Sequence, residues 1–231
     1  MAKTKDKKAG TEFYENPEVL ASQLSKTEEF IEQNKKVVFG VGGLIALVIV
    51  AFFGYRYYMN NQNQEAQKEM FQAVYWFENE ELDKAIDGDG NSYGFLSIVE
   101  DYGSTKAGNL ANYYLGAIYL KKGEFETAVD YLDAFSADDL LIQSRAYALK
   151  GDAYMELGNY TLAAEQYGKA ADHKSTSEFT PGYLMKQALA YQKANAPNDA
   201  LASYKRIVED YKKSREYIEA RKYLSLLEAK N

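Results

Sequence analysis

Hydrophobic and polar residues are unevenly distributed along this chain, and one apolar stretch near the amino end stands out. It reads VVFGVGGLIALVIVAFFGY from Val37 to Tyr55, carries no charge, and lies between Lys35-Lys36 and Arg56. At about 1.5 Å per helical residue, its length is close to the roughly 30 Å hydrocarbon core of a bilayer. The pattern predicts one transmembrane helix. Because no small-residue cleavage site follows, we expect a retained anchor and not a removed secretory signal.

Basic residues near this stretch indicate its orientation. Lys35 and Lys36 precede it, with further lysines upstream, whereas only Arg56 follows it before Lys68. Lysine and arginine are retained on the cytoplasmic side of a membrane helix. We therefore expect a cytoplasmic amino terminus and an extracytoplasmic chain from about residue 60 onward.

Beyond the apolar stretch, small and aromatic residues recur with a long period. Segment 115–135 matches segment 150–170 at an offset of 35 residues, and a third segment, 187–207, follows at an offset of 37. The recurring positions are Gly116, Gly151 and Ala188; Tyr119, Tyr154 and Tyr191; Gly123, Gly158 and Asn195; Phe125 and Tyr160; and Ala128, Ala163 and Ala200. This pattern resembles the tetratricopeptide repeat, a helix–turn–helix unit of about 34 residues.

Packing of two antiparallel helices explains this pattern. Small residues let the helices approach closely, and aromatic rings fill the remaining space. Gly123, Gly158 and Asn195 fall at the turn between the helices, where a left-handed backbone suits glycine and asparagine. Pro197 is suited to the first turn of the next helix. Because no single pair buries its own apolar face, the units are expected to stack into a solenoid.

The sequence thus predicts an all-α protein with one amino-terminal transmembrane helix followed by a tetratricopeptide-repeat α-solenoid. Its parts are a cytoplasmic head with a short helix (1–36), the transmembrane helix (37–58) and a periplasmic repeat domain (59–231). The domain comprises a divergent pair (62–102, with helices at 64–85 and 93–102), repeats at about 107–136, 144–172 and 180–211, and a capping helix (214–229). Whether the membrane helix continues into the domain or ends in a flexible joint at NNQNQ stays open.

The head contains a predicted helix start at Asn16-Pro17, with asparagine as the cap and proline in the first turn. A modest apolar stripe follows, formed by Val19, Leu20, Leu24, Phe30 and Ile31. This stripe is consistent with a helix on the inner membrane surface or on a partner protein. A short solvated helix is the alternative.

Composition excludes several classes of protein. The 231 residues include no cysteine, so disulfide scaffolds, thiol catalysis and thiolate zinc sites are ruled out. Residues 60–231 carry 19 Lys and Arg against 27 Asp and Glu. Such an acidic domain argues against nucleic acid as a partner, because that binding depends on neutralising phosphates.

No catalytic, cofactor-binding or metal-binding constellation is evident. The single histidine, His173, lies in a polar link and is expected to be a surface residue rather than a general base. The run from Asp87 to Asn91 (DGDGN) resembles the start of a calcium loop. Ser92 and Ile98 stand where such a loop requires glycine and glutamate, so a plain turn is expected. We therefore predict that the protein is not an enzyme.

A protein-binding surface is the remaining interpretation. In tetratricopeptide domains the first helix of each pair lines the concave face, and the aligned positions give a candidate surface here. It comprises Leu110, Tyr113, Ala117, Leu120, Lys121, Arg145, Asp152, Met155, Glu156, Met185, Leu189, Gln192 and Lys193. Within the membrane helix, a small-residue face suited to packing against another helix consists of Gly40, Gly42 and Gly43.

The succession of head, membrane helix and repeat domain resembles the YfgM-like family of bacterial inner-membrane proteins. The resemblance includes the head ENPEVLASQLSKTEEFIEQNKK, which leads directly into the membrane helix. It implies an ancillary subunit of the Sec translocon that works beside a PpiD-type prolyl isomerase and assists translocated proteins. A general periplasmic scaffold for envelope assembly or cell division is the alternative. An organelle import receptor would place the repeats in the cytosol, which the basic residues oppose.

Overall fold

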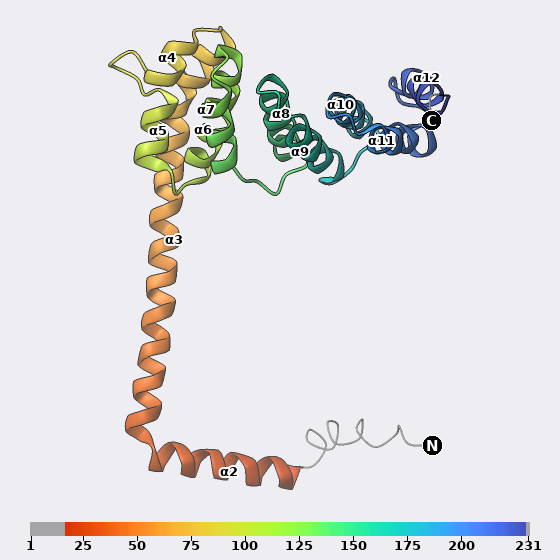
Figure 1. Ribbon diagram of the computed structural model, residues 1–231. Coiled ribbons are helices and arrows are strands. Elements are labelled where there is room, and N and C mark those ends of the chain that lie inside the picture. The colour runs from red at the N-terminus through yellow and green to blue at the C-terminus, as the bar shows by residue number, and fades with distance from the viewer. Residues whose placement is uncertain (1–16, 230–231) are drawn as a thin grey trace, which may run out of the picture. The chain divides into compact units, whose positions relative to one another are not determined.

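The computed structural model describes residues 17–229, and the elements within them are helices (Figure 1). The chain divides into two compact units, unit 1 (Met1–Tyr58) and unit 2 (Met59–Asn231). The predicted head lies in unit 1 and the predicted repeats lie in unit 2. Residues 1–16, which include the predicted cap Asn16, lie outside the described residues.

Unit 1 contains helix α2 (Pro17–Gln33) and the first part of α3 (Lys35–Glu78). Pro17 is the first residue of α2, as the sequence predicts for a helix that begins with proline. Three residues of the predicted apolar stripe, Leu24, Phe30 and Ile31, are exposed on α2.

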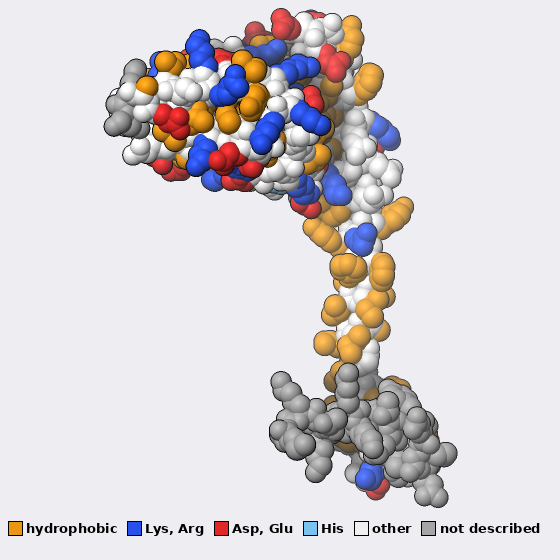
Figure 2. Space-filling model, turned by 90° about the vertical axis from the view of Figure 1, so that its right-hand side faces the viewer, with side chains coloured by type: hydrophobic (Ala, Val, Ile, Leu, Met, Phe, Trp, Pro, Cys, Tyr) orange, Lys and Arg blue, Asp and Glu red, His pale blue; other side chains and the backbone are white. Residues whose placement is uncertain are grey.

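Helix α3 spans 44 residues and contains the whole predicted membrane stretch. It is long and apolar enough to cross a bilayer. Figure 2 shows this part of the helix covered with hydrophobic side chains, which are exposed along their length. The helix is unbroken from Asn60 to Gln64, where the sequence left a joint open.

Unit 2 contains the last part of α3 and nine further helices within the described residues. They are α4 (Leu82–Asp87), α5 (Phe95–Tyr102), α6 (Lys106–Lys122), α7 (Phe125–Ala134), α8 (Ile142–Glu156), α9 (Tyr160–Asp172), α10 (Thr180–Lys193), α11 (Pro197–Asp210) and α12 (Tyr217–Glu228). From α4 to α12, each helix packs mainly against its neighbours in the chain. The pairs α6–α7, α8–α9 and α10–α11 coincide with the three predicted repeats, and α12 with the predicted capping helix.

Four turns between helices share one backbone geometry. Their central residues have positive φ angles of 61° at Glu80, 79° at Gly123, 73° at Gly158 and 57° at Asn195. In each turn the next residue donates its N–H to a carbonyl five residues back, at 2.8–2.9 Å, a pattern that closes helix ends. These bonds are Glu81 to Trp76, Glu124 to Tyr119, Asn159 to Tyr154 and Ala196 to Tyr191. The turns predicted at Gly123, Gly158 and Asn195 are confirmed.

The fourth turn, at Glu80, corrects the predicted boundaries of the first pair. The expected helix over 64–85 ends at Glu78, and a new helix, α4, begins at Leu82. Helix α4 then stops at Asp87, because the DGDGN turn interrupts it before α5 begins at Phe95. The first pair therefore consists of the end of α3 packed with the broken second helix α4–α5.

Small residues bring the two helices of each pair together. Ala85, Ala128, Ala163 and Ala200 each follow a turn by five positions, and all four are fully buried. A side-chain carbon added at Gly151 would lie 2.6 Å from the Tyr167 ring, closer than any ordinary contact. The close approach expected from the recurring small residues is confirmed.

Six ion pairs join consecutive helix pairs of unit 2, and all have the same polarity. In each one the acidic residue belongs to the earlier part of the chain and the basic residue to the later part. The pairs are Glu80–Lys121, Asp83–Lys122, Asp133–Lys150, Asp138–Lys174, Asp152–Lys186 and Asp172–Arg206. Exposed pairs contribute little free energy individually. Their common polarity nevertheless opposes packing of two helix pairs through the same face, which would bring like charges together.

Candidate functional site

The predicted binding residues lie on neighbouring helices of unit 2. Helix α6 contacts α8, and Asp152 of α8 pairs with Lys186 of α10 at 2.7 Å, so the first helices of the pairs lie side by side. None of the predicted residues is fully buried. We call the surface formed by the accessible residues of α6, α8, α10 and the end of α3 from Gln67 onward the first-helix face.

Several predicted residues are already engaged in contacts within unit 2. Lys121 lies 3.2 Å from the carboxylate of Glu80 and 5.4 Å from the centre of the Phe77 ring. Gln192 donates a hydrogen bond of 2.8 Å to the hydroxyl of Tyr204. These side chains join helices to one another, so their contribution to a binding surface is indirect.

Asp152 is the most strongly held of the predicted residues. One of its carboxylate oxygens accepts a hydrogen bond of 2.6 Å from the hydroxyl of Tyr167 and one of 2.7 Å from Lys186. Lys186 also lies over the Tyr167 ring. Burial and the Asp152 carboxylate both raise the pKa of Tyr167, which keeps this phenol protonated as a donor. The cluster ties α8, α9 and α10 together.

The apolar members of the predicted set are more accessible. Leu189 is exposed, and Leu110, Tyr113, Met155 and Met185 are half-exposed at the edges of the hydrophobic clusters of unit 2. Methionine and leucine side chains adapt to irregular apolar partners. The first-helix face therefore offers apolar contact area between positions that are fixed by ion pairs.

An apolar groove of about 410 Å³ opens between the end of α3 and α6. Its α3 wall includes Phe71, whose side chain is 74% exposed, a high value for a large apolar residue. The groove is lined by Gln67, Met70, Phe71, Val74, Lys106, Ala107, Leu110 and Tyr114. Of these, only Leu110 belongs to the set predicted from the sequence.

The opposite wall of the groove is held in place by aromatic packing. Tyr114 stacks on Phe95 with ring centres 4.8 Å apart and meets Phe77 edge-on at 5.2 Å. Such aromatic pairs stabilise a defined side-chain orientation. The groove is therefore preformed on this side, as apolar binding sites usually are.

The α3 half of the groove was missed because the sequence gives no glycine at the first turn. When Glu80 is aligned with Gly123, Met70 and Val74 take the positions of Tyr113 and Ala117 on α6. Val74 is half-exposed and belongs to the first-helix face, whereas Met70 is buried beneath it. The signal that finds them is the spacing of Ala73, Trp76 and Ala85, which repeats that of Gly116, Tyr119 and Ala128.

Arg145 is the cation at the centre of the first-helix face. It is exposed on α8, and its charge reaches the hydroxyls of Tyr113 on α6 and Tyr183 on α10. Burial raises the pKa of both tyrosines, and the guanidinium opposes that rise. Lys106 lines the groove, so the first-helix face carries a cation there as well as at Arg145.

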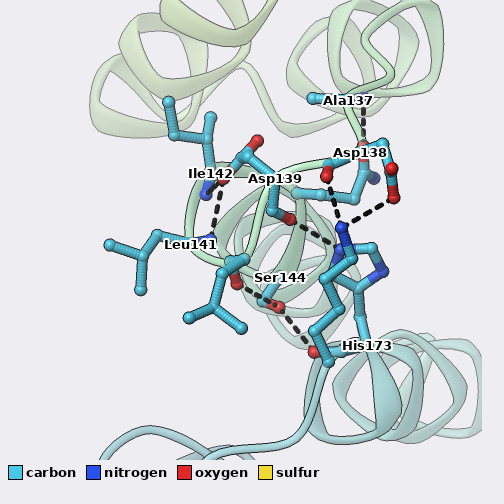
Figure 3. A network of polar contacts seen from close by, with 10 residues as sticks. Ala137, Asp138, Asp139, Leu141, Ile142, Ser144 and His173 are labelled. Carbon is cyan, nitrogen blue, oxygen red and sulfur yellow. Dashed lines mark hydrogen bonds and ion pairs between the residues drawn. The ribbon is translucent and has the colours of Figure 1, made fainter.

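The structure places His173 in a hydrogen-bonded junction. Its Nε2 donates to the backbone carbonyl of Asp139 at 2.7 Å, and the Ser144 hydroxyl donates to the His173 carbonyl at 3.2 Å (Figure 3). His173 is half-buried at this junction. Its contacts link the α7–α8 connection to the end of α9.

The DGDGN segment forms the plain turn that the sequence predicts. The Asp89 carboxylate accepts hydrogen bonds from the N–H groups of Asn91 at 3.0 Å and Ser92 at 2.8 Å, which lower the pKa of this carboxyl. Among residues 17–229, no group of three or more His, Asp or Glu side chains is arranged to hold a metal ion.

The predicted helix-packing glycines lie on the exposed apolar part of α3. A side-chain carbon added at Gly40, Gly42 or Gly43 would meet no atom within 4 Å. This strip of the helix surface is therefore accessible within the chain itself, and its use by a second membrane helix stays a prediction.

No protein-family model matches the chain, and a search of curated proteins finds no similar sequence.

Proposed function

We propose that this protein is a membrane-anchored scaffold that binds polypeptide segments on the first-helix face of unit 2. The observation that carries the proposal is the apolar groove beside Phe71. Its volume of about 410 Å³ falls within the roughly 300–1,000 Å³ of typical ligand sites. A groove with apolar walls and few polar groups suits apolar side chains of a polypeptide, and Lys106 and Arg145 suit a carboxylate next to them.

The proposal treats unit 2 as a tetratricopeptide-repeat solenoid. Support comes from the helix pairs spaced by 35 and 37 residues, the four equivalent turns and the four buried alanines that follow them. A stack of such pairs exposes the first helices on one side, which suits partner binding.

The proposal places the protein in a bacterial inner membrane, with its amino terminus in the cytoplasm and unit 2 in the periplasm. The length and apolarity of α3 and the lysines that precede it support this arrangement. The resemblance to the YfgM-like family then suggests an ancillary, non-enzymatic subunit of the Sec translocon that works with a PpiD-type prolyl isomerase. A general periplasmic scaffold for envelope assembly or cell division is the second candidate.

Purification in mild detergent after crosslinking, followed by mass spectrometry, tests the assignment. Translocon subunits and a prolyl isomerase should copurify with the full chain. Phe71→Asp should reduce the recovery of bound polypeptides, because a buried charge opposes apolar contact in the groove. Leu162→Asp, on α9 away from the groove, is the matched control and should leave recovery unchanged.

Two results would contradict the proposal. Recovery of envelope-assembly or division proteins without translocon subunits would favour the second candidate. Equal recovery from the wild type and Phe71→Asp would mean that the groove is not the binding site.

A further inference from the structure

The α7–α8 and α9–α10 connections, which lead into the first helices of two pairs, lie at one end of unit 2. Asn63, near the start of unit 2, accepts a hydrogen bond of 3.0 Å from the N–H of Ala107 in the first turn of α6. Asn109, also in that turn, exchanges hydrogen bonds of 2.8 and 3.1 Å with Ser136 in the α7–α8 connection. These contacts place the α7–α8 connection at the end where the chain enters unit 2 from the membrane-length stretch.

Four large apolar side chains are exposed at this end. Leu140, Leu141 and Phe179 border the same small cavity between the α7–α8 and α9–α10 connections, and Ile142 follows in the chain. Their exposed fractions are 43% for Leu140, 49% for Leu141, 36% for Ile142 and 46% for Phe179. We call these four residues the apolar edge. Single exposed apolar residues are common, but three in succession beside a phenylalanine mark a contact surface.

The backbone beneath the apolar edge is fixed by the junction in Figure 3. The Asp139 carboxylate accepts hydrogen bonds from the N–H groups of Leu141 at 2.7 Å and Ile142 at 2.6 Å. The Asp139 carbonyl in turn accepts the hydrogen bond from His173. Figure 3 shows the Leu141 and Ile142 side chains pointing away from this network. The junction therefore holds the Leu141 and Ile142 side chains outward, although a free loop could fold them inward.

A polar segment adjoins the apolar edge. Ser177 and Glu178, directly before Phe179, share a hollow with residues 209–216 of the α11–α12 connection. Three cations of that connection, Lys212, Lys213 and Arg215, are exposed, and carboxylates line the same hollow at Glu178, Glu209, Asp210 and Glu216. Because both signs of charge are present, burial of apolar side chains and not net charge would drive binding here.

We propose that the apolar edge inserts into the interfacial layer of the bilayer that α3 crosses. This inference rests on the membrane anchoring in the proposed function. It is favoured by the position of the edge at the end of unit 2 that continues from the membrane-length stretch. Because α3 would anchor unit 2 to the bilayer, the effective concentration of the apolar edge at the membrane surface is high. A few apolar side chains then suffice for contact. The adjoining lysines and arginine then reach lipid phosphates.

The chain has no cysteine, so single-cysteine labelling tests the inference directly. Leu141→Cys and Phe179→Cys, in the full chain reconstituted into phosphatidylcholine–phosphatidylglycerol vesicles, would carry an environment-sensitive fluorophore. Leu162→Cys is the matched control: Leu162 is 41% exposed and lies near the start of α9, at the opposite end of α8 from Ile142. A quencher attached to lipid chains should reduce fluorescence at positions 141 and 179 but not at 162.

A second variant and an extraction assay make each outcome informative. Leu140→Asp should abolish quenching at position 179 without loss of helix signal in circular dichroism. Equal quenching at all three positions, or none at 141 and 179 in chains that resist alkaline extraction, would overturn the inference and leave the proposed function intact. A change in fluorescence that depends on protein concentration and not on the lipid-attached quencher would overturn the inference, because it would indicate that the apolar edge binds a second copy of the protein. Release of the chain by alkaline extraction would refute the membrane anchor and the inference with it.

Discussion

The close approach of α8 and α9 predicts a specific cost for one methyl group. In the variant Gly151→Ala the added carbon would lie 2.6, 2.7 and 2.9 Å from three atoms of the Tyr167 ring. Carbon atoms prefer separations of about 3.5–4.0 Å, so the ring or the helix would have to move by roughly 1 Å. Tyr167 is buried and cannot move freely, because its hydroxyl donates to Asp152 at 2.6 Å.

Two effects set the size of the destabilisation. Overpacking of a core costs about 1–3 kcal/mol. Loss of a hydrogen bond to a charged group costs about 1.5–3 kcal/mol. Asp152 keeps its pair with Lys186, so the second cost should lie near its lower limit. We expect Gly151→Ala to lower the free energy of unfolding by about 2.5–4.5 kcal/mol.

Denaturant unfolding of the full chain in detergent measures this effect, with circular dichroism for the helices and the single tryptophan, Trp76, as a second probe. The substitution Tyr167→Leu should destabilise the wild type but cost less in the Gly151→Ala background, because the smaller side chain relieves the clash. An unchanged midpoint for Gly151→Ala would refute the packing argument. It would show that α8 and α9 can separate without a cost in free energy. The next pair, α10 and α11, already accommodates an alanine at the equivalent position, Ala188.

Three further substitutions test the energetics of unit 2. Burial, chiefly, raises the pKa of Tyr204 to about 12, so the contribution of this phenol to the unfolding free energy should be constant below about pH 10 and be lost as pH rises toward 12. Tyr204→Phe should reduce that fall, as measured by unfolding at pH 8, 10 and 11; an equal pH dependence in the variant would contradict the assignment. Asp133→Ala leaves the nearly buried ammonium of Lys150 without its partner and should cost about 2 kcal/mol, less than a fully buried pair because the Asp133 side chain is 55% exposed. Lys150→Met should lower the free energy of unfolding by less than Asp133→Ala does, because it leaves no unpaired charge behind. The reverse order would show that an unpaired Lys150 ammonium is not the source of the cost.

The sequence predicted the regular part of unit 2 well, because its signals are local. Gly123 and Gly158 fix a left-handed turn, and Ala128 and Ala163 mark the close contact five positions later. The apolar run of α3 is equally direct, since length and composition alone define it. Helices therefore lie where the three repeats and the capping helix were predicted, with only small shifts at their ends.

The first pair was harder to predict because its local signals conflict. Glu80 occupies a left-handed turn that usually selects glycine, so the helix predicted over 64–85 hides a break. The groove was missed for the same reason: without a glycine to mark the first turn, the end of α3 could not be aligned with the first helices of the later pairs. His173 shows a different limit: its partner is the backbone carbonyl of Asp139, and a contact between distant backbone and side-chain atoms leaves no pattern in the sequence.

The proposed function depends on the groove beside Phe71, and site-specific photocrosslinking at that residue shows whether polypeptides bind there. A photoreactive phenylalanine analogue at position 71 should capture polypeptides in membranes that are actively translocating proteins, and capture should fall when translocation is blocked. The same analogue at position 162 should capture none of these polypeptides. Equal capture at both positions, or capture at position 71 that does not respond to translocation, would contradict the account.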